Sequence, residues 1–243
     1  MLHALLKGKL RPETPDVERL EDALTSAVIG SLVLAQAWDA LDSWLGSAQS
    51  LCGRWHPPAS PSNVKPQAWF WPWLGQTEPD VVLVLPSATY VVEAKHRSGR
   101  HDLRRDSDGA EEERTRDQLV RQFEDVCTIR ARGRIDDPLL AALTIREVRF
   151  VYVVDGRRRA RALAECKESH AAPPCGTEPW ALGLTTWQRL HTLLLKLGDP
   201  KLEPILQYAE RLNLVEYRGH FLLADAAEGA RAVKEMHFNR RRK

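Results

Sequence analysis

Residues 79–95 read PDVVLVLPSATYVVEAK and hold two short apolar runs that are separated by a proline and a serine. Such runs, rich in valine, predict two buried strands, Val81–Leu85 and Tyr90–Ala94. The residues between them suit a tight connection, so the strands are expected to pair as an antiparallel hairpin. The hairpin is the starting point for the rest of the chain.

The register of this hairpin predicts that three polar side chains meet. With the turn at residues 86–87, partner positions bring Asp80 opposite Glu93. Cross-strand neighbours have Cβ atoms roughly 4.5–5.5 Å apart. Side chains alternate between the two faces, so Lys95 lies on the same face as Glu93. Two carboxylates and one ammonium are therefore expected at one end of a hydrophobic hairpin.

This combination of charges indicates a metal site. Two adjacent carboxylates repel each other unless a cation lies between them, and hard oxygen ligands suit Mg²⁺ or Mn²⁺. Such an ion lowers the pKa of a bound water and neutralises charge on a phosphate. Lys95 would orient the water or help to deprotonate it, and the Ala94 carbonyl is a further candidate ligand. The alternative is a surface ion pair of Glu93 with Lys95 and an Asp80 that caps a turn.

The remaining patterns predict an α/β protein with a mixed sheet flanked by helices. Apolar residues recur every three to four positions in the helical segments and run continuously in the strand segments. The expected helices are 17–35, 38–51, 117–132, 157–168, 186–196 and 203–212, and the further strands are an irregular or edge strand at 69–74, then 148–154 and 180–184.

The pair Pro79-Asp80 followed by Glu93-Ala94-Lys95 resembles the PD-(D/E)xK pattern of the restriction-endonuclease-like nucleases. The resemblance covers roughly residues 16–155, and the segments 21–25 and 93–99 are similar to uncharacterised bacterial nucleases, some of them associated with phage defence. It implies a restriction-endonuclease-like core with a C-terminal helical extension. It also implies Mg²⁺-dependent hydrolysis of DNA, with catalytic residues Asp80, Glu93 and Lys95.

The resemblance also implies a further metal ligand from the first helix. Nucleases of this family often place an acidic residue of that helix near the metal, and Glu21 is the candidate here, with Glu18 and Asp22 as competitors. The expected metal ligands are therefore Glu21, Asp80, Glu93 and Ala94.

The resemblance further implies that one face of a second helix borders the same site. Gln118 and Arg121 are separated by three positions and lie on one helical face, where they would hold DNA phosphate or orient Lys95. His96 is expected to point away from Lys95 and to be structural or to contact phosphate.

Composition limits the classes of protein that fit. The chain has 243 residues, 43% hydrophobic and 28% charged, with a net charge of +2, which suits a sizeable core. No apolar run is long enough to cross a membrane and no secretory signal is recognised, so we expect a cytoplasmic protein. The expected divisions are a tail (1–15), a nuclease core (16–184) and a helical extension with a basic tail (185–243).

The distribution of charge favours DNA as the partner, because basic clusters occur at 97–105, 157–161 and 240–243. Two alternatives remain open at this stage. The first is an inactive nucleic-acid- or protein-binding module of the same fold within a larger complex. The second is a structural subunit of a homodimer or a larger defence complex, with an interface at the leucines of segment 193–197.

Overall fold

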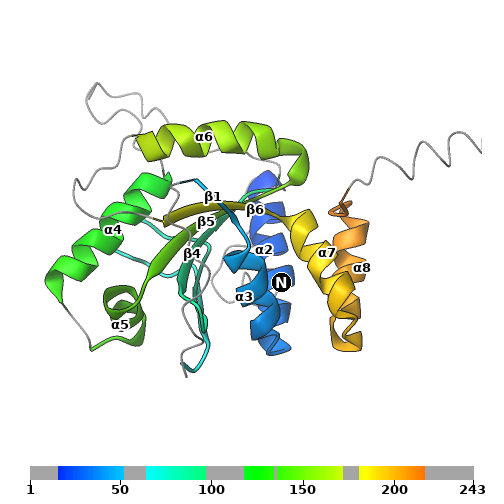
Figure 1. Cartoon of the computed structure of the whole chain (residues 1–243), viewed down its shortest axis with the longest axis horizontal. Helices are drawn as coiled ribbons and strands as arrows, with labels where there is room; N and C mark the ends of the chain where they lie inside the picture. The colour runs from blue at the N-terminus through cyan, green and yellow to red at the C-terminus, as the bar shows by residue number, and fades with distance from the viewer. Residues whose placement is uncertain (1–15, 52–63, 97–117, 134–135, 172–180, 217–243) are drawn as a thin grey trace, which may run out of the picture.

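The computed structural model describes residues 16–51, 64–96, 118–133, 136–171 and 181–216, which form an open mixed sheet between two helical layers (Figure 1). The strands lie in the order β1-β6-β5-β4-β3-β2; β4, β5 and β6 are parallel, and the other neighbours are antiparallel. The predicted α/β layout is confirmed. The strand bounds are β1 Gln49–Ser50, β2 Gln67–Phe70, β3 Val81–Val84, β4 Thr89–Ala94, β5 Val148–Val154 and β6 Ala181–Thr186.

The hairpin has the register that the sequence predicts. Val81 lies opposite Val92 and Leu83 opposite Tyr90, so the next pair along the strands is Asp80 with Glu93. The turn is closed by a hydrogen bond of 3.0 Å from the Leu85 N–H to the Ala88 carbonyl. All four residues of β3 and all six of β4 are buried. The two apolar runs thus account for the strand pairing and for the complete burial of both strands.

One face of the sheet is covered by α4 Gln118–Arg132, α5 Pro138–Ile145 and α6 Arg159–Ala171 (Figure 1). Val82 and Val91 of the hairpin contribute to this layer, together with Phe123 of α4. Because side chains alternate along a strand, Asp80, Glu93 and Lys95 continue this same face beyond Val82 and Val91. The candidate site therefore lies where the α4 layer meets the end of the hairpin.

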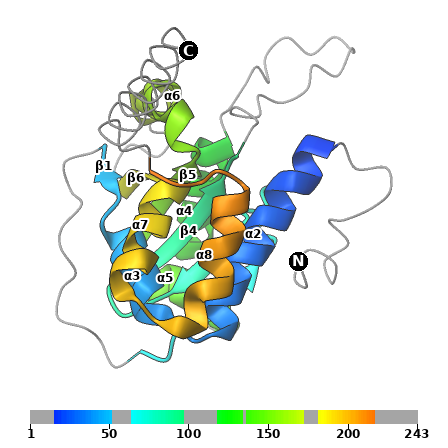
Figure 2. The same ribbon diagram turned by 90° about the vertical axis from the view of Figure 1, so that its right-hand side faces the viewer.

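The other face carries α2 Asp16–Leu34, α3 Trp38–Gly46, α7 Trp187–Leu197 and α8 Glu203–Arg211, which lie side by side in Figure 2. The two helices expected as an extension contribute Leu190 and Ile205 to the same hydrophobic cluster as Leu24 and Trp44. Leu194, expected at an interface, is buried in this cluster, whereas Leu195 is exposed. The predicted division at 184/185 falls inside β6.

The structure differs from the sequence prediction at two places in particular. The helix expected at 38–51 ends at Gly46, and the two-residue strand β1 follows it. Helix α5 was not predicted, although Asp137 caps its N-terminus and Pro138 occupies its first turn. No helix among the described residues is long and apolar enough to cross a bilayer. The predictions for the tail, for the basic segment 97–105 and for the C-terminal basic run concern residues outside those described.

Candidate active site

Three charged groups meet at the end of the hairpin. Lys95 Nζ lies 2.5 Å from Glu93 Oε1, and these two residues are 8% and 2% exposed. Asp80 Oδ2 accepts a hydrogen bond of 2.7 Å from the Ala94 N–H, so the Asp80 side chain lies against the backbone between Glu93 and Lys95. All three charged side chains line one pocket of about 300 Å³. The juxtaposition expected from the register is therefore present.

The charges of the pocket perturb one another. Burial and the neighbouring Glu93 carboxylate raise the pKa of Asp80 well above its ordinary value, although Lys95 and the Ala94 hydrogen bond lower it. Burial by itself would lower the pKa of Lys95, but Glu93, Asp80 and, more weakly, Glu21 raise it above the ordinary value. Lys95 is consequently an ammonium at neutral pH, and Asp80 is the acid that resists ionisation.

Helix α4 fixes the Glu93 carboxylate from above the sheet. Gln118 Nε2 and Gln122 Nε2 donate hydrogen bonds of 3.0 and 2.8 Å to Glu93 Oε2. The two glutamines are four positions apart, so they lie on one face of the helix. Arg121 lines the same pocket, and its Nε is buried without a hydrogen-bond partner among the described residues.

Asp125 of α4 holds the loop that leads into Asp80. Its Oδ2 accepts hydrogen bonds of 2.8 Å from the Thr77 N–H and 2.5 Å from the Thr77 hydroxyl, and both of its oxygens lie 3.1 Å from the Gln76 nitrogen. Gly75 enters this loop with φ of +135°, a conformation that suits glycine. One helix thus positions both halves of the candidate motif.

The acidic residues of α2 divide between two positions. Glu21 Oε1 accepts a hydrogen bond of 3.0 Å from the His96 N–H and so holds the chain just beyond β4. Asp22, the competing candidate, lines the pocket, and its charge raises the pKa of Asp80. The side chain of Glu18 is outside the described set. The structure therefore brings Asp22 into the pocket lining, while the role of Glu21 as a metal ligand stays a prediction.

Strand β5 and the first residue of α7 hold the backbone of Lys95. Trp187 Nε1 donates a hydrogen bond of 3.2 Å to the Lys95 carbonyl, and the Lys95 N–H donates one of 2.7 Å to Val153. His96 is 3% exposed, and its Nδ1 lies 3.8 Å from Asp155 Oδ2. Burial would raise the pKa of Asp155, but hydrogen bonds from Arg157 lower it, so Asp155 is an anion in this cluster.

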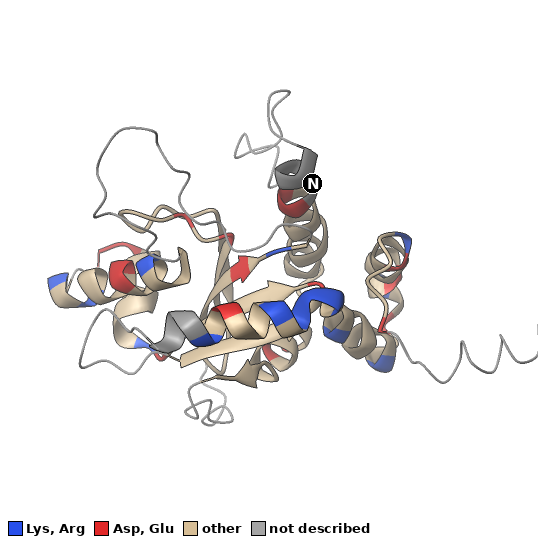
Figure 3. Ribbon diagram, turned by 90° about the horizontal axis from the view of Figure 1, so that it is seen from above, with Lys and Arg blue, Asp and Glu red and all other residues tan. Residues whose placement is uncertain are grey.

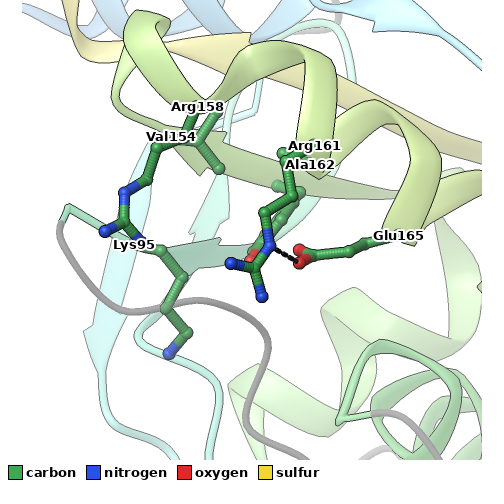
Figure 4. A pocket seen from close by; sticks show the side chains of 7 residues that line it. Lys95, Val154, Arg158, Arg161, Ala162 and Glu165 are labelled. Carbon is green, nitrogen blue, oxygen red and sulfur yellow. Dashed lines mark hydrogen bonds and ion pairs between the residues drawn. The ribbon is translucent and has the colours of Figure 1, made fainter.

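A second hollow opens beside Lys95 on the α6 side, between Tyr152, Arg158, Arg161 and Glu165 (Figure 4). Arg161 Nε donates a hydrogen bond of 2.8 Å to Glu165 Oε1, which the dashed line in Figure 4 marks. Burial raises the pKa of Tyr152, which is therefore neutral in this hollow. Lys95 thus shares the lining of this small hollow with two arginines of the segment that follows β5.

The donor atoms of the pocket fit a hard divalent cation. The N–H and C=O of one strand residue point to the same edge, so the Ala94 carbonyl is directed toward the edge on which Asp80 lies. Asp80, Glu93 and Ala94 thus supply two carboxylates and a carbonyl, and Mg²⁺ is typically bound by one or two carboxylates with several waters. Among the described residues, no group of three His, Cys, Asp or Glu side chains could hold a metal ion.

Comparisons of the chain with protein-family models, with curated proteins and with solved structures found no match. The assignment of a function therefore depends on the geometry of the pocket and on the motif that it contains.

Three contributors to the site were not selected as site residues from the sequence: Asp22, Gln122 and Asp125. Gln122 and Asp125 follow Gln118 at intervals of four and three positions, which is the spacing of one helical face. A polar stripe on a helix whose other face is apolar was the available signal. For Asp22 the signal was weaker, because adjacent helix positions differ in direction by only about 100°.

Proposed function

We propose that the protein is a Mg²⁺- or Mn²⁺-dependent deoxyribonuclease with a restriction-endonuclease-like core. Its PD-(D/E)xK motif would consist of Pro79-Asp80 and Glu93-Ala94-Lys95. The observation that carries the proposal is the antiparallel register, in which Asp80 contacts the backbone of Ala94 while Glu93 and Lys95 form a buried ion pair in the same pocket. A surface ion pair with a turn-capping aspartate would not need a buried, mutually perturbed set of charges.

The metal would be held by the Asp80 and Glu93 carboxylates and the Ala94 carbonyl. When bound, the ion would supply Lewis-acid activation of water and neutralisation of phosphate charge. The carboxylates of Asp80 and Glu93 would provide the negative charge for this binding, and the glutamines of α4 hold Glu93 in one orientation. Preorganised carboxylates avoid reorganisation during the reaction, which is the main physical advantage of such a site.

Lys95 acts in this proposal as a hydrogen-bond donor. Its raised pKa keeps it protonated at neutral pH, so it orients the attacking water and stabilises negative charge on the phosphate. Arg121 offers a second cation in the same pocket, with an Nε that has no partner among the described residues. Cationic side chains can bind a phosphodiester beside the two carboxylates that would hold the metal, so binding and cleavage would occur at one place.

The experiment is a DNA cleavage assay on the full chain with Mg²⁺, Mn²⁺ or EDTA, using supercoiled and linear DNA. Asp80→Asn and Lys95→Met are expected to lower the cleavage rate by about 100-fold or more. Asp39→Asn and Lys65→Met remove the same charges at exposed positions and should cut like the parent protein. Circular dichroism would check that each variant is folded.

Metal-dependent cleavage that survives in both Asp80→Asn and Lys95→Met would reject the assignment of the site. Tight DNA binding without cleavage under any of these ions would instead favour an inactive binding module. The same assay with an RNA strand of the same sequence would show whether cleavage requires deoxyribose.

A further inference from the structure

A ridge of arginines crosses the end of the sheet beside the candidate site. It comprises Arg157 and Arg158 of the short helix η1 Gly156–Arg158, and Arg159 and Arg161 of the first turn of α6. All four side chains are exposed. In Figure 3 the blue of Lys and Arg covers η1 and the start of α6, which lie toward the viewer. Helix η1 follows β5 in the chain, and the C-terminal end of β5 lies next to that of β4, because the two strands are parallel neighbours.

The four arginines differ in how far their charge is compensated. Arg157 is bound to the Asp155 carboxylate, and Arg161 to Glu165. The side chain of Arg158, which lines the hollow beside Lys95, makes no hydrogen bond or ion pair with any described residue. Arg159 Nη2 donates a hydrogen bond of 2.7 Å to the neutral amide oxygen of Gln49, so it is oriented but keeps its full charge.

A large groove continues from the ridge, between α3, β6 and α7. It has a volume of about 930 Å³, and its lining includes Arg159, Arg189 and Lys196. Arg189 Nε donates a hydrogen bond of 3.0 Å to the neutral hydroxyl of Ser47, and the side chain of Lys196 makes no hydrogen bond or ion pair with any described residue. Glu216 is the one acidic residue among the described residues that line the groove, and it accepts a hydrogen bond from Thr192.

The groove and the hollow beside Lys95 are adjacent. Arg158 lines the hollow and Arg159 lines the groove, and consecutive Cα atoms are only about 3.8 Å apart. The groove is too large for one phosphate ion. Two of its cations, Arg189 and Lys196, are seven positions apart on α7, which is about 10 Å along the helix axis. The hollow has a volume of only about 10 Å³, so it admits at most a water-sized group. A polymer with regularly spaced negative charges fits the exposed cations, because one chain can contact Arg158 at the rim of the hollow and the cations of the groove together.

We propose that Arg158, Arg159, Arg189 and Lys196 bind the phosphate backbone of the DNA on one side of the cleavage site, along a track from Lys95 over η1 into the groove. This inference rests on the proposed deoxyribonuclease function for the identity of the polymer. The contacts are to phosphates, so binding on this track is independent of base sequence and weakens as salt concentration rises.

The test measures binding without cleavage. Fluorescence anisotropy with a labelled DNA oligonucleotide of about 20 nucleotides, single-stranded or duplex, is recorded in EDTA over a range of salt concentrations. The double variant Arg159→Ala/Arg189→Ala is compared with Arg132→Ala/Lys65→Ala, which removes the same charge at exposed positions. Arg132 ends α4, and Lys65 precedes β2 at the turn end of the hairpin, so both lie away from the groove.

The first double variant is expected to weaken binding by about 10-fold and to reduce the slope of log K against log salt by about two. The control should change the affinity by less than about two-fold, because it keeps the track intact. Thermal unfolding of both would confirm folded protein. Equal losses in both double variants, an unchanged slope, or binding of an RNA oligonucleotide in place of DNA would each overturn the track.

Failure of this inference is distinguishable from failure of the nuclease assignment. If the protein binds DNA through these arginines but never cuts it, the proposed phosphate track is supported and the nuclease assignment is refuted. If the protein cuts DNA and the Arg159→Ala/Arg189→Ala variant binds it as tightly as the parent, the nuclease assignment is supported and the phosphate track is refuted.

Discussion

Replacing Asp125 by alanine removes the acceptor for the loop that precedes Asp80. Three donors lose their partner: the N–H groups of Gln76 and Thr77 and the hydroxyl of Thr77. Gln76 is exposed, so water can replace the carboxylate there, whereas Thr77 is 4% exposed and both of its donors are left unsatisfied. Hydrogen bonds to charged groups contribute about 1.5–3 kcal/mol each, so the loss of the two Thr77 bonds is expected to lower the unfolding free energy by about 3–6 kcal/mol.

Urea denaturation followed by circular dichroism measures this loss. Asp125→Asn keeps one of the two acceptor oxygens, and its expected cost is about half that of the alanine variant. Asp136→Ala, at an exposed position outside this network, should change the stability by less than about 0.5 kcal/mol. Because the loop positions Asp80, any folded fraction of Asp125→Ala should also cut DNA at least about 10-fold more slowly.

A loss below about 1 kcal/mol for Asp125→Ala would refute the reasoning, because it would mean that the Thr77 donors are satisfied elsewhere. Normal cleavage with a large loss of stability would refute the second step, since the loop would then be irrelevant to the position of Asp80.

Three further predictions concern the charges of the pocket. Asp80→Asn should raise the Tm of the metal-free protein at neutral pH. The pKa of Asp80 is raised in the folded state, so ionisation of this carboxyl destabilises the fold as pH rises from 3.8 through the folded-state value. In acid the carboxyl is neutral in both states, and the difference in Tm between Asp80→Asn and the parent protein should vanish. Mg²⁺ binding should release a proton from Asp80 at mildly acidic pH, visible by calorimetry in buffers of different ionisation enthalpy and absent in Asp80→Asn. Gln122→Leu should cost about 1–3 kcal/mol in urea denaturation and slow cleavage, because Glu93 Oε2 loses its closer amide donor; unchanged values in both assays would contradict this role.

The hairpin could be predicted because its information is local. Residues 79–95 contain both strands and the turn, and the turn length alone fixes which residues face each other. The face on which Glu93 and Lys95 lie then follows from the alternation of side chains. No distant residue has to be known for these steps.

The supporting residues could not be predicted in the same way. Asp125 is 49 positions from Gln76, and no local pattern says that this carboxylate serves that loop. The choice between Glu21 and Asp22 depends on the rotation of α2 about its axis, which the packing against the sheet determines. Helix α5 is apolar nearly all round, so it lacks the periodicity that marks an amphipathic helix.

Helix α4 explains how one pocket can hold charges that repel. Gln118 and Gln122 satisfy the outer oxygen of Glu93, and Asp125 holds the loop before Asp80, so a single rigid element fixes both carboxylates. Lys95 supplies a countercharge to Glu93, while burial and, after it, the Glu93 charge raise the pKa of Asp80. On the proposed function, a divalent cation bound here would relieve the repulsion between the two carboxylates without moving them, because α4 already fixes their positions.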